Sequence, residues 1–278
     1  IYEAFEKSGF QLNPSMLNTY KTYFSDKTWG GKGFGATPPE YTDFAKTNEV
    51  SELSPSELAS INPNYKEDFS SYNDAAIVVV GRPGGESKEY VAGANPECTT
   101  GNIMGLSEEE REIIKLAKDN FKKVIVLVNS VTTMEIKELR DDPDIDAIMW
   151  IGYPGAYGFY AVADVLNGTV SPSASLGDVF VSNNQANPSM QSFGNIPWAN
   201  ASEFEAAENV NSYLVEAEGI YQGYRYYETR YNDIVNGNED AKTAKAGTWT
   251  KDDSTIGTTN GTWNYTNEVT YPFGYGLS

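Results

Sequence analysis

An unbroken apolar run, Ala75–Val80, stops abruptly in a glycine-rich turn that carries charged residues. A short run rich in β-branched residues and bounded by Gly and Pro is typical of a strand buried on both faces, as in a parallel sheet. The turn that follows, Arg82–Tyr90, should therefore lie at the carboxyl end of that strand. In open α/β sheets ligands bind at this edge, because loops meet there and helix N-termini point at the crevice.

One acidic residue of this turn is the leading functional candidate. Glu86 directly follows Gly84 and Gly85. The two glycines permit backbone conformations and a close approach that bulky residues forbid, so they can lift the Glu86 side chain clear of the sheet. The alternative interpretation of Glu86 is an ordinary solvated carboxylate on a loop.

The pattern of an apolar run followed by a helix occurs three times. The runs are Ala75–Val80, followed by a helix that Ser107 caps and Glu110 completes as a capping box; Val124–Val128, followed by a helix over about Thr133–Leu139; and Ala147–Ile151, followed by a helix over Tyr160–Leu166. Strands that alternate with helices predict βαβ units and an α/β fold, a mostly parallel sheet with helices on both faces.

The remaining segments predict less regular structure. Short helices are expected within Ile1–Phe10, after Asn13-Pro14 and after Ser54-Pro55, so that residues 1–73 form a helical and loop-rich N-terminal part. We interpret Ser171–Asn211 as polar loop and residues 232–268 as a surface insertion in a single domain over residues 1–278. Because Ile1 is not a methionine, we expect a fragment or a processed chain.

Composition limits the chemistry and the partners. The chain has no histidine, which excludes a Ser-His-Asp triad, a Cys-His pair and histidine metal sites. The net charge of −19 argues against nucleic acid and anionic membranes as partners, because both reward basic patches. Cys98, the one cysteine, is interpreted as a spare thiol. No apolar run approaches the about 20 residues that cross a bilayer, and the sequence leaves the localisation open.

Four motifs follow one another along the chain. They are the Arg82-x-Gly-Gly-Glu86 turn; Tyr153-Pro-Gly155 with Ala163–Gly168 and Ser171–Ser173; Glu218-Gly-Ile-Tyr-x-Gly-Tyr-Arg-Tyr-Tyr-Glu228; and Tyr271-Pro-Phe-Gly-Tyr-Gly-Leu-Ser278. In this order they resemble the (α/β)6-type sandwich domain of glycoside hydrolase family 3, the β-glucosidase family. The Glu-Thr-Arg sequence at 228–230 is most similar to bacterial members in which this sandwich precedes a (β/α)8 barrel.

The resemblance implies a retaining β-glycosidase of β-glucosidase or β-xylosidase type, which removes terminal non-reducing sugars from β-glycosides without a cofactor or metal. It places Glu86 as the acid/base, and Arg82, Gly84, Gly85 and Glu89 in the substrate-binding turn. In that family the nucleophilic aspartate belongs to the barrel, which nothing in this chain resembles. A β-linked oligosaccharide or glycoside and the barrel of the full-length protein are therefore the expected partners, and this chain alone is expected to be inactive.

The turn also departs from the family pattern, which leaves alternatives open. The family has Gly after the glutamate and an Asp two residues further on, whereas Ser87 follows Glu86 here and the next acidic residue is Glu89. Glu89 or Glu97 could carry the acid/base role instead. An alternative function is a non-catalytic sugar-binding or scaffolding α/β module, and a third is a doubly wound domain for a small acidic or phosphorylated ligand.

The aromatic segment before Glu228 has two interpretations as well. Its tyrosines, Tyr221, Tyr224, Tyr226 and Tyr227, could form a platform on which a sugar ring stacks. Aromatic residues at this density more often pack a core or a domain boundary, and we favour that interpretation.

Overall fold

The computed structural model describes residues 1–25, 52–82, 104–155, 157–191, 216, 218–238 and 263–277. The chain divides into two compact units. The first, here the sheet unit, comprises Ile1–Tyr90, Ala94–Ala174 and Gly276–Ser278; the second, here the aromatic unit, comprises Val91–Gly93 and Ser175–Tyr275. The single domain expected over residues 1–278 stays a prediction.

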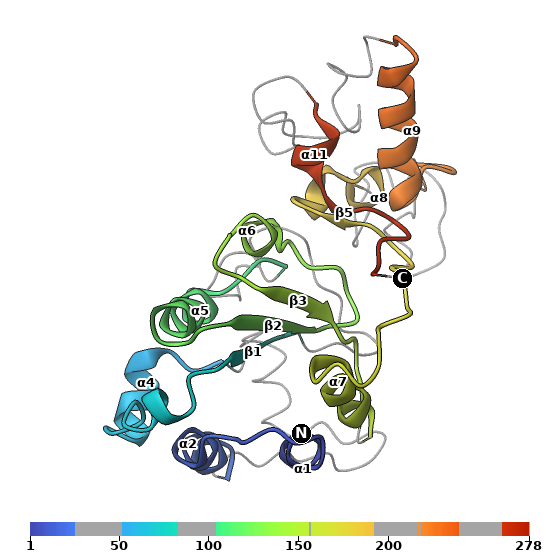
Figure 1. Ribbon diagram of the computed structural model, residues 1–278. Coiled ribbons are helices and arrows are strands. Elements are labelled where there is room, and N and C mark those ends of the chain that lie inside the picture. Colours follow the sequence, from blue (N-terminus) through green and yellow to red (C-terminus); the bar gives the residue numbers. More distant parts are fainter. Residues whose placement is uncertain are drawn as a thin grey trace, which may run out of the picture. The chain divides into compact units, whose positions relative to one another are not determined.

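The sheet unit is built on three parallel strands. They are β1 (Ala76–Gly81), β2 (Val124–Asn129) and β3 (Ala147–Trp150), hydrogen-bonded in the order β1-β2-β3 (Figure 1). Ala76 lies opposite Val124, and Ile125 lies opposite Ala147. The three apolar runs of the sequence therefore form the parallel sheet that they predict, with bounds that agree to within a residue.

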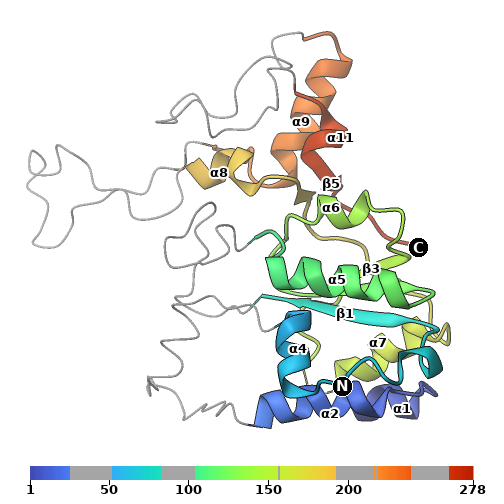
Figure 2. The same cartoon turned by 90° about the vertical axis from the view of Figure 1, so that its left-hand side faces the viewer.

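Helices cover both faces of this sheet, as Figures 1 and 2 show. On one face α5 (Glu108–Asn120) contacts β1 and β2. On the other face α7 (Gly158–Leu166) and α1 (Tyr2–Lys7) pack together, and their Val162, Ala163 and Phe5 form a buried cluster with Leu127 of β2. This arrangement confirms the α/β sandwich, because apolar side chains of one strand are buried against helices on either side.

Three further helices complete the N-terminal part of the sheet unit. They are α2 (Pro14–Ser25), α4 (Pro55–Ile61) and the 3-10 turn η1 (Phe69–Ser71). Ser54 caps α4 in a complete capping box with Glu57, as the sequence predicts. The short helices expected in this part are thus confirmed within the described residues.

The helix expected over Thr133–Leu139 is wrong in its first half, because α6 spans only Lys137–Arg140. Two hydrogen bonds, one local and one long-range, take the backbone before it out of helical geometry. The Ser130 hydroxyl accepts from the backbone nitrogen of Thr132 at 3.1 Å, and the nitrogen of Glu135 donates to the carbonyl of Met104 at 2.8 Å. A serine turn and a long-range backbone bond therefore override the helical spacing of the apolar residues.

The aromatic unit has a two-stranded antiparallel sheet, β4 (Phe180–Val181) and β5 (Val269–Tyr271), and the helix α9 (Tyr224–Val235). Its smaller helical elements are η2 (Asn184–Ala186), α8 (Pro188–Gln191) and α11 (Tyr265–Glu268). The interpretation of Ser171–Asn211 as polar loop is therefore wrong for β4, η2 and α8. β4 pairs with β5, which is distant in sequence, so the local pattern carries no signal for this strand.

Most tyrosines of the aromatic segment before Glu228 pack in or against the buried core of this unit. It consists of Val179, Val181, Tyr227, Trp263 and Val269, with Tyr224 and Tyr226 packed against it. Tyr227 is fully buried, whereas Tyr221 is 45% exposed. Core packing is therefore confirmed for most of these tyrosines.

The expected surface insertion at 232–268 is described only at its two ends. Residues 232–235 complete α9, and Trp263 and Glu268 are buried. Both ends belong to the packed unit, and the insertion stays a prediction for residues 239–262, which lie outside the described residues.

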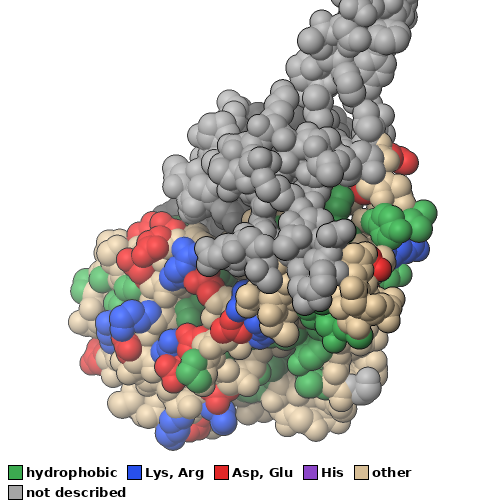
Figure 3. Space-filling model, turned by 90° about the horizontal axis from the view of Figure 1, so that it is seen from above, with side chains coloured by type: hydrophobic (Ala, Val, Ile, Leu, Met, Phe, Trp, Pro, Cys, Tyr) green, Lys and Arg blue, Asp and Glu red, His purple; other side chains and the backbone are tan. Residues whose placement is uncertain are grey.

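The face drawn in Figure 3 carries both acidic and basic side chains. In the view of Figure 3, acidic and basic side chains lie interspersed. Ion pairs such as Lys118–Asp142, at 2.6 Å, contribute to this mixing. Within the described ranges, no helix combines the length and the apolar character that crossing a membrane requires.

Candidate functional site

The carboxyl ends of the three parallel strands meet at one edge, and each strand is followed there by residues with polar contacts. Arg82 follows β1, Ser130 follows β2, and the turn Gly152–Gly155 follows β3. Loops at this edge of a parallel sheet are the usual location of ligand sites. Glu86 stands four residues beyond Arg82 in sequence and lies outside the described residues.

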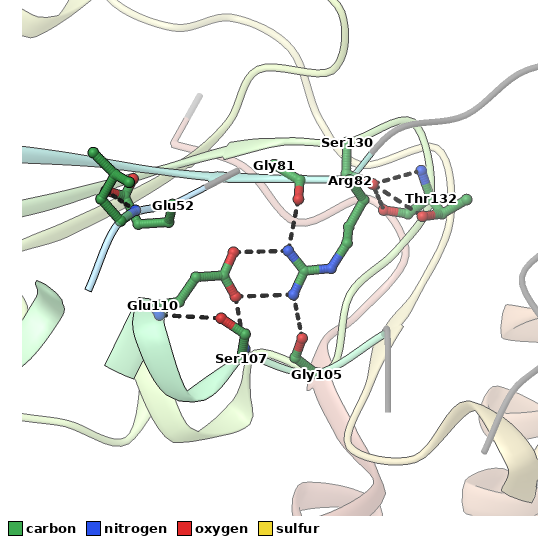
Figure 4. A network of polar contacts seen from close by, with 9 residues as sticks. Glu52, Gly81, Arg82, Gly105, Ser107, Glu110, Ser130 and Thr132 are labelled. Carbon is green, nitrogen blue, oxygen red and sulfur yellow. Dashed lines mark hydrogen bonds and ion pairs between the residues drawn. The ribbon is translucent and has the colours of Figure 1, made fainter. Parts of the chain in front are cut away.

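Arg82 forms a buried, two-pronged ion pair with Glu110 (Figure 4). One guanidinium nitrogen, Nη1, lies 2.7 Å from Oε1 of Glu110, and Nη2 lies 2.9 Å from Oε2. The two side chains are 1% and 0% exposed. Because both charges are removed from water, each one requires the other.

The same guanidinium also holds backbone on both sides of an intervening segment. Nη1 donates to the carbonyl of Gly81 at 2.6 Å, and Nη2 donates to the carbonyl of Gly105. Residues 83–103, which include the turn with Glu86, connect these two anchor points. We call Arg82, Glu110 and the Gly105 carbonyl the Arg82 clamp.

Glu110 is held in position by the start of α5. Its backbone nitrogen donates to the Ser107 hydroxyl at 3.1 Å, and its carboxylate accepts from the Ser107 backbone nitrogen at 2.8 Å. The sequence predicts this capping box correctly but not the ion pair. A usable signal exists, because a helix that follows a strand in a βα unit begins at the edge where that strand ends.

The loops after the strands are tied to the same edge. The Tyr153 hydroxyl donates to the Arg82 carbonyl at 2.8 Å, and the Arg82 backbone nitrogen donates to the Asn129 carbonyl at 3.1 Å. Asn129 in turn donates from its side chain to the carbonyl of Gly152. The turn needs glycine at its start, because Gly152 has a φ of +55°.

A second acid with limited exposure is Glu52, in the N-terminal part of the sheet unit, and no sequence motif marks it. Glu52 accepts from the Tyr20 hydroxyl at 2.6 Å and from the backbone nitrogen of Leu53 at 3.1 Å. Burial raises the pKa of Glu52 to about 7; these two hydrogen bonds oppose the rise, and the charge of Glu110 adds to it. Figure 4 draws Glu52 beside the Arg82 network.

The aromatic unit contains a comparable acid. Glu268 is 5% exposed, and burial raises its pKa to about 7, while the Arg230 charge opposes the rise. Arg230 lies over the Trp263 ring, 5.0 Å from its centroid, and donates to the Tyr226 hydroxyl at 2.5 Å. These residues are packed into the core of the unit, and among the described residues no group of three or more His, Cys, Asp or Glu is arranged to hold a metal ion.

Of the residues that the sequence places in the site, only Arg82 is described. Gly84, Gly85, Glu86 and Glu89 lie outside the described residues, so their roles stay predictions. Arg82 faces Glu110 and the backbone carbonyls of Gly81 and Gly105. A contact between Arg82 and a sugar also stays a prediction.

Comparison with known proteins gives concordant matches. The model of the glycosyl hydrolase family 3 C-terminal domain matches residues 10–278. A β-glucosidase of Ruminococcus albus is 27% identical over 84% of the chain, and β-glucosidase A of Butyrivibrio fibrisolvens is 27% identical over 76%. The chain spans only 21% and 22% of the length of these two relatives.

A solved structure is similar along almost the whole chain. The β-glucosidase from Paenibacillus barengoltzii is 25% identical, covers 96% of this chain and superposes with a TM-score of 0.57. The matched region is 22% of that protein. The chain therefore corresponds to a minor part of a larger polypeptide in this protein too.

Proposed function

This chain belongs to glycosyl hydrolase family 3, whose C-terminal domain it matches, and from that premise we propose that it is the acid/base-bearing domain of a retaining β-glycosidase. The proposed reaction releases terminal non-reducing sugars from β-glycosides. The names of the relatives favour β-glucosides, and β-xylosides are the second substrate class to test. The observation that carries the proposal is the family match over residues 10–278, which includes the Arg82–Glu86 turn.

Retaining hydrolysis divides the work between two carboxyl groups about 5.5 Å apart. In the first step a carboxylate attacks the anomeric carbon while the acid protonates the glycosidic oxygen, so that the bond to the leaving group breaks. In the second step the same acid residue, now ionised, takes a proton from water, and the resulting attack frees the sugar. We propose Glu86 as this acid/base, and an aspartate of a (β/α)8 barrel in the full-length protein as the nucleophile.

The location of the turn supports this assignment. Arg82 ends β1 at the carboxyl edge of the sheet, and the described contacts of the Arg82 clamp fix the backbone at both ends of residues 83–103. The Arg82–Glu86 turn thus follows the sheet edge at which ligand sites usually form, and we propose that Glu86 acts there. General acid–base assistance from one such group typically contributes about 10²- to 10⁴-fold to the rate.

The test compares the full-length protein with its Glu86→Ala variant on two substrates. The variant should lose about 10²- to 10⁴-fold in kcat/KM on a β-linked disaccharide, because its poor leaving group needs the proton. It should retain most of its kcat/KM on 2,4-dinitrophenyl β-glucoside, whose leaving group departs unaided. Azide should accelerate turnover of the aryl substrate, because an anionic nucleophile needs no general base.

Glu89→Ala and Glu97→Ala are the matched controls, because both replace an acidic residue of the same segment. If one of them shows the selective loss and Glu86→Ala does not, the acid/base role belongs to that residue. If all three behave like the parent on every substrate, the non-catalytic sugar-binding or scaffolding module becomes the better account.

The division of the carboxyl groups between two domains has its own consequence. The 278-residue chain without a barrel should bind glycosides weakly and hydrolyse neither substrate, because the nucleophile is absent. Turnover by the purified chain at more than the rate of a buffer blank would show that both carboxyl groups lie within it.

A further inference from the structure

Arg82 bridges the two ends of a segment that connects a strand to a helix. Its backbone continues β1, since its nitrogen donates to the Asn129 carbonyl at 3.1 Å and its carbonyl accepts from the Tyr153 hydroxyl at 2.8 Å. Its side chain ends on the Gly105 carbonyl and on Glu110. The Arg82 backbone is thus bonded to β2 and to the turn after β3. The Arg82 side chain also holds the backbone at Gly105, just beyond the end of residues 83–103.

From this geometry we infer that the Arg82 clamp is a positioning device for proton transfer, in which Arg82 and Glu110 act on the rate of bond cleavage without touching substrate. The inference rests on the proposed function. It assigns to Arg82 the bracing of the loop rather than a contact with the sugar.

The far end of the segment is buried and hydrogen-bonded too. Met104 is 8% exposed, and its carbonyl accepts from the Glu135 nitrogen at 2.8 Å. Glu110 cannot shift independently, because the Ser107 capping box fixes it to the start of α5. The clamp therefore joins β1, α5 and the returning backbone through buried atoms.

The clamp depends on the shape of guanidinium and not on its charge alone. Nη1 and Nη2 each donate one hydrogen bond to a carboxylate oxygen of Glu110 and one to a backbone carbonyl. The planar guanidinium can make all four bonds because its N–H groups point in fixed directions. A lysine has one amino nitrogen in place of Nη1 and Nη2. It would keep the positive charge opposite Glu110 but could not make all four of these hydrogen bonds. Arg82→Lys therefore separates positioning from charge neutralisation.

The experiment measures kcat/KM of the full-length protein, because this parameter reports the steps up to release of the leaving group. Arg82→Lys should lose about 10- to 100-fold on a β-linked disaccharide, the scale that a misplacement of about 1 Å produces. The loss on 2,4-dinitrophenyl β-glucoside should stay within about 3-fold, since acid assistance contributes little there. Glu110→Gln should give the same selectivity.

Arg111→Lys is the matched control. Arg111 lies on the same helix as Glu110 and forms a two-pronged pair with Glu138, at 3.0 and 2.8 Å, but both of these side chains are 45% exposed. It should leave both substrates unchanged. Tyr153→Phe is a milder second variant for the case that Arg82→Lys does not fold, because it removes the hydroxyl that donates to the Arg82 carbonyl and keeps the ring. It should show the same selectivity at reduced size.

The outcomes separate this inference from the proposed function. Equal losses on both substrates in Arg82→Lys, or no loss in Arg82→Lys and Tyr153→Phe, would overturn the positioning role even if Glu86→Ala shows the selective loss. A selective loss in Arg82→Lys together with a parent-like Glu86→Ala would support the clamp and overturn Glu86 as the acid. Parent-like behaviour of all these variants would overturn both.

Discussion

Replacing Arg82 with methionine isolates the energetic role of the buried ion pair. The change leaves the Glu110 carboxylate, which is 0% exposed, without the cation that faces it at 2.7 and 2.9 Å. It also removes the guanidinium donors to the carbonyls of Gly81 and Gly105. Removing one partner of a buried pair typically costs about 3–5 kcal/mol in the free energy of unfolding, a large part of the about 5–15 kcal/mol that typical domains possess.

The double variant Arg82→Met/Glu110→Gln makes the reasoning quantitative. Glutamine keeps an acceptor for the Ser107 backbone nitrogen, so the cap survives while the stranded charge disappears. The double variant should therefore be more stable than Arg82→Met alone by about 2 kcal/mol, because the cost of the unpaired charge is relieved. An additive pair of independent contributions would instead make it less stable.

Equilibrium urea unfolding followed by fluorescence measures both differences. Arg111→Met, which breaks the exposed pair with Glu138, is the control and should cost at most about 1 kcal/mol. A cost below about 1 kcal/mol for Arg82→Met, similar to that of the control, would refute the description of this pair as buried and mutually dependent. A double variant less stable than either single variant would refute the account of the stranded charge.

Two further predictions concern stability elsewhere in the chain. Burial raises the pKa of Glu52 and Glu268 to about 7, so between about pH 4 and pH 7 the folded state keeps protons that the unfolded chain releases. The contribution of each protonated carboxyl to the free energy of unfolding is therefore complete below about pH 4 and is lost as the pH rises through about 7. The loss is at most about 3 kcal/mol for each group. Unfolding should need less urea at about pH 8 than at about pH 5, and Glu52→Gln with Glu268→Gln should flatten this difference; an unchanged pH profile would contradict the burial of these acids. Gly158→Ala would place a methyl carbon 2.7 Å from Cβ of Pro154 and should lower the free energy of unfolding by about 1–3 kcal/mol. Gly177→Ala, whose added methyl group meets nothing within 4 Å, should be near neutral in the same assay. Equal effects of the two changes would contradict the close packing at the start of α7.

The sheet could be predicted from sequence because its signals are local. Each apolar run, such as Val124–Val128, is long enough to indicate a buried strand, and the Ser107 capping box marks the start of the following helix. The order of runs and helices then allows few arrangements besides a parallel sheet.

The missed features depend on contacts between distant residues. β4 is two residues long and exists through its pairing with β5, about ninety positions later in the chain, so no window around Phe180 could reveal it. Glu52 accepts a hydrogen bond from Tyr20, 32 positions away in the chain, and Arg82 pairs with Glu110, 28 positions away. The motif around Arg82 marks this residue as a candidate, but it does not predict that the side chain pairs with Glu110.

The identity of the product formed by the Glu86→Ala variant of the full-length protein in the presence of azide tests the central claim most directly. With 2,4-dinitrophenyl β-glucoside as donor, the account predicts β-glucosyl azide of retained configuration, because azide attacks the glycosyl-enzyme intermediate where water lacks its general base. The product can be identified by mass spectrometry and NMR. Release of glucose alone, at the parent rate and without the azide adduct, would contradict Glu86 as the acid/base.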